Sequence, residues 1–176
     1  LAFNQETTPT WGTAGDCNLA AAGIYYDSFG MSPVRDSSPV EGIGMTVAGQ
    51  RNASNINVAG NLVAPFNYDG NCVRLLTLFA PDTYGAGGGP TYVHTFTSKT
   101  VAINTFLTFS EKVPQVSGSA AYRVVNPASG TSLTLRGSLN DTVRIEIGLL
   151  GDTWDGTAAA PNNSHSNVTL PSTNAF

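Results

Sequence analysis

Apolar residues recur at every second position in short runs along most of the chain after Ile43, and Gly, Pro, Asn and Asp separate these runs. An alternation of period two is typical of a β-strand with one buried face, and the separating residues favour turns. The predicted strands cover 45–48, 56–59 with 61–63, 73–79, 92–96, 101–109, 121–125, 132–136 and 143–149. Seven or eight strands at this spacing predict an all-β protein that folds as a single β-sandwich or jelly roll.

The run 142–147 shows the alternation most clearly. Its apolar residues occupy every second position, and Arg144 and Glu146 share the opposite face. We therefore expect one side of this strand to lie in the core and the other to face water.

Few segments depart from the strand pattern. A helix signal is confined to 16–22, where Asp16 can cap a short turn. The segments 31–41, 82–90 and 157–166 are rich in Pro, Gly or Asn and are predicted to be loops.

The length of 176 residues fits one domain, with 1–10 as an N-terminal extension and 11–176 as the β-domain. Charged residues make up only 11% of the chain and the net charge is -4. A chain with so few cations lacks the basic surface that nucleic acid or an anionic membrane attracts. No apolar stretch approaches the roughly 18 residues of a membrane span. We therefore expect neither a nucleic-acid partner nor a membrane span.

The chain begins at Leu1 rather than at an initiator methionine. This start predicts a mature, extracellular chain from which a signal peptide has been removed. An even number of cysteines in a secreted protein indicates a disulfide, here between Cys17 and Cys72. Such a bridge would contribute on the order of 4 kcal/mol to stability. Two buried thiols are the alternative.

The sequence offers little catalytic equipment. His94 and His165 are the only histidines, no Gly-x-Ser-x-Gly motif occurs, and the glycine run 85–89 lacks the lysine of a phosphate-binding loop. We therefore expect that the protein is not an enzyme.

Oxygen donors gather in two turns. Asp69, Asp152 and Asp155 lie in segments rich in Gly and Asx residues, and carboxylates in such turns are ligands that Ca²⁺ prefers. Calcium is therefore the candidate cofactor, although the same residues form turns without a metal. Four sequons supply candidate glycosylation sites at Asn52, Asn140, Asn162 and Asn167.

In general plan, the chain resembles donor-strand filament subunits, namely the chaperone-usher pilins and the archaeal thread, bundling-pilus and cannula proteins. The resemblance rests on the predicted secreted β-sandwich, a short extension before Trp11, few charges and many Ser, Thr, Asn, Gly and Ala residues. It implies a structural subunit of an extracellular filament or tube, assembled from copies of itself as the terminal strand of one subunit enters the sheet of the next.

The N-terminal extension is the candidate donor strand. Leu1 and Phe3 fall on one face at period two and would enter the groove of a neighbour, and Pro9 would end the strand. The predicted subunit interface consists of Leu1, Ala2, Phe3, Gln5 and Thr7. Two alternatives remain: the extension is an edge strand of its own sheet, or the C-terminal run with Val168 is the donor.

Two other functional classes fit the same composition. A carbohydrate-binding or adhesin module would bind glycans through the aromatic residues Trp11, Trp154, Tyr25, Tyr26 and Tyr84. A non-enveloped capsid protein would suit a jelly roll, but the chain has no basic arm for a genome.

Overall fold

The computed structural model describes residues 1–5, 17, 22–40, 50–67, 71–80, 82–86, 92–97, 105–114, 120–158, 165 and 168. These residues contain two short helices, α1 (Asn71–Leu75) and the 3-10 helix η1 (Leu76–Leu78). They also contain ten strands: β1 (Ala2–Gln5), β2 (Ala22–Gly23), β3 (Ser28–Phe29), β4 (Ser32–Val40), β5 (Gln50–Pro65), β6 (Asp82–Ala86), β7 (Tyr92–Phe96), β8 (Leu107–Val113), β9 (Ala121–Arg136) and β10 (Arg144–Ala158).

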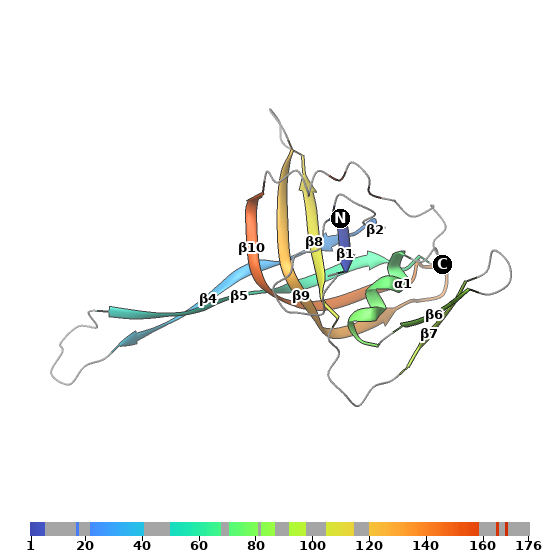
Figure 1. Cartoon of the computed structure of the whole chain (residues 1–176), viewed down its shortest axis with the longest axis horizontal. Coiled ribbons are helices and arrows are strands. Elements are labelled where there is room, and N and C mark those ends of the chain that lie inside the picture. Colours follow the sequence, from blue (N-terminus) through green and yellow to red (C-terminus); the bar gives the residue numbers. More distant parts are fainter. Residues whose placement is uncertain are drawn as a thin grey trace.

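Eight strands form one antiparallel sheet in the order β2-β1-β8-β9-β10-β5-β3, with β4 also paired to β5. The strands β6 and β7 form a separate hairpin. The all-β prediction is confirmed. The prediction of a sandwich or jelly roll is not, because the long strands belong to a single sheet that curls around one side (Figure 1).

The curl comes from the long strands β9 and β10, whose partners change along their length. The first half of β9, up to Ala128, pairs with β8, while β10 pairs with β5 through residues 144–151. The pairing of β9 with β10 shifts by one residue at Thr131. This β-bulge increases the local twist and bending of the sheet. The sheet therefore turns its inner face toward itself.

The core lies on this inner face. Phe3, Phe109, Ile145 and Ile147 are almost completely buried there, and the rings of Phe3 and Phe109 lie 5.9 Å apart. Each large apolar side chain buried in this way stabilises the fold by about 1.5–3 kcal/mol. The expected alternation of 142–147 is confirmed, since Arg144 and Glu146 lie on the other face of β10.

The prediction of a strand at 73–79 is wrong, because α1 and η1 occupy most of this segment. The buried side chains are those of Cys72, Leu75 and Leu78, at a spacing of three residues that places them on one side of a helix. A short apolar run does not distinguish a buried strand from a buried helix. The helices cover the inner face of the sheet, where Phe79 lies against Gly130 of β9.

Two predicted loops contain strands. Segment 31–41 contains β4, and segment 82–90 contains β6. Proline at positions 33 and 39 suggested a loop, but a proline is compatible with a strand whose outer edge lacks a partner. Of the helix predicted at 16–22, only Cys17 and Ala22 are described, and Ala22 opens β2.

Other predicted strands merge into longer ones. The runs 56–59 and 61–63 both belong to β5, and the runs 121–125 and 132–136 both belong to β9. The run 45–48 lies outside the described residues. In the part of the chain that the structure describes, no helix is long and apolar enough to cross a membrane.

The strand β5 packs closely against the two residues that connect β3 to β4, and this packing requires a glycine at position 60. A Cβ atom added at Gly60 would lie 2.2 Å from the backbone oxygen of Gly30, whereas one added at Gly30 would meet nothing nearer than 3.8 Å. We predict that Gly60→Ala lowers the free energy of unfolding by about 1–3 kcal/mol, as expected for overpacking against a backbone. Gly30→Ala is the matched control and should change it by less than about 1 kcal/mol. Urea denaturation of both variants measures the difference, and equal stabilities would contradict this packing.

Candidate functional site

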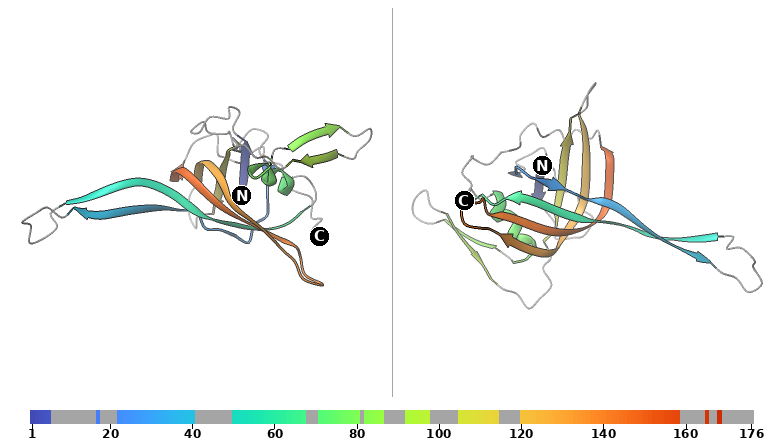
Figure 2. Two further views of the ribbon diagram at one scale, coloured as in Figure 1. Left: turned by 90° about the horizontal axis from the view of Figure 1, so that it is seen from below. Right: turned by 180° about the vertical axis from the view of Figure 1, so that it is seen from behind.

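The most extended feature of the molecule is a two-stranded ribbon formed by β4 and the first half of β5, which we call the arm. The strand β5 pairs with β10 only from Val58 onward, so residues 50–57 pair with β4 alone among the described strands. Eight strand residues span about 26 Å. All views show the arm leaving the body of the protein (Figures 1 and 2).

The two long edges of the arm differ in chemistry. Pro33 and Pro39 of β4 have no N–H group, which removes two donors from that strand. Residues 50–57 of β5 include no proline. The β5 edge is therefore better equipped to accept another strand than the β4 edge.

The hairpin that joins β9 to β10 carries a group of charged side chains. Arg136 pairs with Glu146 at 3.0 Å, and Arg144 pairs with Asp27 at 3.0 Å and with Asp141 at 3.1 Å. The hydrogen bond to Asp27 and the charge of Asp141 raise the pKa of Arg144. A shallow hollow of about 290 Å³ lies between these residues. Because carboxylates already neutralise both arginines, the hollow is a poor anion site.

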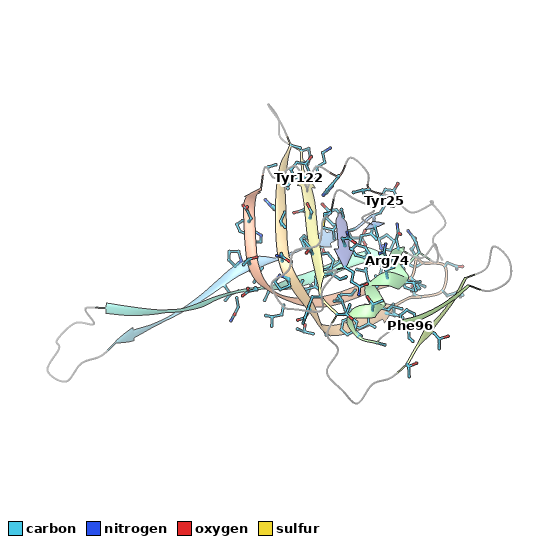
Figure 3. All side chains as sticks on the ribbon, viewed as in Figure 1. Tyr25, Arg74, Phe96 and Tyr122 are labelled. Carbon is cyan, nitrogen blue, oxygen red and sulfur yellow. The ribbon has the colours of Figure 1, made fainter. Side chains whose placement is uncertain are left out.

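A second polar group lies on the outer face of β8. His165 Nε2 lies 2.8 Å from Ser110 Oγ, and its ring makes an edge contact with Tyr122, which Figure 3 labels at the start of β9. Burial and the positive charges of the Leu1 amino group and Lys112 lower the pKa of His165 to about 4. His165 is therefore neutral at pH 7.

This serine and histidine do not make a hydrolytic site. Ser110 has no exposed surface, so a substrate carbonyl could not approach its hydroxyl. The contact holds the His165 side chain against the sheet. The sequence pattern does not reveal this partner, since residues 55 positions apart meet only through the fold.

A buried carboxylate marks the inner face near the N-terminus. The Tyr26 hydroxyl donates a 2.8 Å hydrogen bond to Glu111, and Arg123 lies 3.4 Å from the same carboxylate. Burial and this hydrogen bond raise the pKa of Tyr26 to about 12. A tyrosine with a raised pKa holds its proton, so the group is a structural anchor between β8 and the start of β3.

The structure does not join the two cysteines, so the predicted disulfide is corrected. The Cys17 thiol donates to the Thr108 carbonyl, and the Cys72 thiol donates to the Pro65 carbonyl. Cys17 packs with Ala2, whereas Cys72 belongs to the main core. Neighbouring residues of a strand point to opposite faces, and the two cysteines lie on opposite sides of β1.

The predicted donor strand is also corrected. Ala2 and Phe3 of β1 pair with β2 on one side, and all four residues of β1 pair with β8 on the other, within the same chain. Leu1 hydrogen-bonds to Ile24, and Phe3 lies in the core. The period-two pattern identified the strand but could not identify its partner. Gln5 is the exposed end of β1, and Thr7 lies outside the described residues.

The candidate calcium residues do not converge where they can be placed. Asp152 and Asp155 are exposed on β10, and Asp69 lies outside the described residues. Within the described ranges no three His, Cys, Asp or Glu side chains are grouped as metal ligands would be. Among the described residues the buried Asn67 side-chain oxygen finds no hydrogen-bond partner, but one oxygen ligand does not make a metal site.

The four sequons remain predictions. Asn140 is exposed in the turn between β9 and β10, and Asn52 lies in the arm. Asn162 and Asn167 lie outside the described residues. No protein-family model matches the sequence, and no curated protein is significantly similar to it.

The neutral state of His165 has a consequence for stability. Unfolding returns its pKa from about 4 to the ordinary value of 6.5, so the unfolded state binds a proton first as the pH falls. We predict that the stability contributed by neutral His165 is fully present above pH 6.5 and is lost progressively as the pH falls to about 4. Urea denaturation at several pH values measures the free energy of unfolding. Between pH 4 and 6.5 this free energy should change less with pH in His165→Gln than in the intact chain. Equal pH dependence of the free energy of unfolding in the intact chain and in His165→Gln would contradict the assignment.

Proposed function

We propose that the protein is a structural subunit that assembles outside the cell with copies of itself into a filament or tube. The single observation that carries this proposal is the arm. It extends about 26 Å beyond the strands that share the core, so a long paired segment of backbone lies outside the folded body.

An arm of this kind calls for a partner on physical grounds. A two-stranded ribbon by itself is at best marginally stable in water, because it has no second layer to bury its side chains. The part of β5 before Val58 receives no third strand from the described residues. Contact with a neighbouring subunit would supply the missing cover.

The composition supports assembly rather than a soluble enzyme or a nucleic-acid partner. With 11% charged residues, copies of this chain repel one another weakly and can approach closely. The arm sequence is rich in Ser and Asn, which suits pairing through backbone hydrogen bonds and water.

The mechanism of assembly differs from the one that the resemblance to pilins implies. The N-terminal strand is enclosed between β2 and β8 in its own chain, so it is not proposed as the exchanged element. The arm takes this role, with the β5 edge as the surface that meets the neighbour.

A glycan-binding module is the second candidate. Trp154 and Tyr25 are exposed large aromatic side chains, and Tyr25 lies in the connection between β2 and β3 (Figure 3). Exposed rings of this type can stack on sugars. This function would require no arm, which makes the two candidates separable.

We predict that removing the arm abolishes long assemblies without unfolding the body. Residues 36–55 are replaced by Asn-Gly, which joins the directly paired Arg35 and Ile56 in a two-residue turn. Sedimentation and electron microscopy should show filaments or tubes for the intact chain and species of one or two subunits for the variant. The melting temperature should change by only a few degrees, on the order expected for a surface change of this size.

The second hairpin offers a matched control. Replacing residues 87–91 by Asn-Gly joins the directly paired Ala86 and Tyr92 and shortens a different connection. This variant should assemble like the intact chain. Unchanged assembly after arm removal would contradict the proposal, and a monomeric intact chain that binds glycans would favour the second candidate.

A further inference from the structure

The inner face of the main sheet carries two exposed leucines near the C-terminal end of β9. Leu133 is paired with Ile147 and Leu135 with Ile145, so each leucine shares the inner face with a core isoleucine. The two isoleucines are fully buried, whereas Leu133 is 38% and Leu135 is 54% exposed. The apolar layer therefore continues onto β9 and meets solvent there.

Among the described strands, the backbone of the same segment has a partner on one side alone. The pairing of β8 with β9 ends at Ala128, and within the described ranges residues 129–136 pair only with β10. A strand with one open edge and an apolar inner face is suited to accept a further strand. The end of this hairpin points away from the body in the left view of Figure 2.

The open edge lacks the usual protection against pairing. Edge strands are commonly protected by proline, lysine or inward charges. Residues 132–135 contain none of these, and the bulge at Thr131 and the charge of Arg136 lie on either side of them. By contrast, β4 carries two prolines.

We propose that β9 of one subunit pairs antiparallel with β9 of a second copy across a two-fold axis. This inference rests on the proposed function and deepens it by naming a contact between subunits. The axis passes through Thr134, which faces the partner's Thr134. A two-fold axis perpendicular to the sheet keeps both inner faces on the same side and gives one continuous sheet.

The sequence of the segment is complementary to itself in this register. Leu133 lies opposite the partner's Leu135, and Leu135 lies opposite the partner's Leu133, so four leucines form one patch next to the two cores. A pair of threonines at the centre is a favourable cross-strand pair. A shift by one residue would place each leucine opposite a polar residue, on the wrong face.

The charges permit the same register. Arg136 lies opposite the partner's Ser132, so no like charges meet directly. Its guanidinium is already paired with Glu146 at 3.0 Å in its own chain. A second copy would therefore cover the exposed leucines of this edge without bringing like charges together.

Cross-linking tests the register directly. Thr134→Cys places two thiols opposite each other across the axis, within the reach of a disulfide. We expect this variant to form covalent dimers under mild oxidation. Leu139→Cys is the matched control, since Leu139 is 92% exposed in the nearby turn but lies off the axis. Equal cross-linking of the two variants would overturn the proposal.

A substitution tests the apolar contact. Leu135→Arg should weaken self-association on the order of tenfold or more, because it places two like charges beside the axis. Leu150→Arg is the control: Leu150 is 40% exposed on the opposite face of the sheet, next to the buried Leu149. A loss of melting temperature for Leu135→Arg without a change in association would show that the edge is covered within its own chain, and would overturn the proposal.

The arm-deleted protein separates this inference from the proposed function. Dimers that cross-link through Thr134→Cys in that background support the β9 contact whether or not the intact chain forms filaments. Filaments of the intact chain that do not cross-link through Thr134→Cys overturn the β9 contact and leave the arm proposal standing.

Discussion

A single β-sheet must cover its own apolar face, and the rest of this structure follows from how that is achieved. The strands β9 and β10 form a long hairpin. At one end of it β9 pairs with β8, and at the other end β10 pairs with β5. The bulge at Thr131 bends the sheet between these ends, and the inner faces then share Phe3, Phe109, Ile145 and Ile147. The helices α1 and η1 add apolar side chains to the inside of the curl, where a second sheet would stand in a sandwich.

The same solution leaves strand edges exposed, because a curled sheet does not close as a barrel does. One open edge belongs to the arm and the other to the end of β9. Within the described ranges these edges have no strand partner on one side, and the second also carries exposed leucines. The proposed assembly assigns a partner to each of them. A subunit with two different contacts can extend in two directions, which is the geometric requirement for a polymer.

The polar groups found within the body have structural roles that are consistent with this assignment. The Ser110 contact holds His165 on the outer face, and Glu111 is held by Tyr26 and Arg123. Each group is satisfied by its own chain, and Ser110 is closed to solvent. Fixed internal contacts of this kind keep the body rigid, while the surfaces proposed for recognition are the strand edges.

The all-β class and the inward-facing side of the strands could be predicted from the amino-acid sequence, because both follow from an alternation between neighbouring residues. Ile145 and Ile147 are buried as their alternation with Arg144 predicts. Which elements pair with one another became known from the three-dimensional arrangement of the chain. The pattern at Ala2–Gln5 fits a neighbour's sheet as well as its own, the run at 73–79 fits a strand as well as a helix, and the count of cysteines does not say that β1 separates them. The exposure of Leu133 and Leu135 was likewise invisible, because their alternation is the same as that of the core. Periodicity is a local property, whereas pairing and burial are set by residues far along the chain.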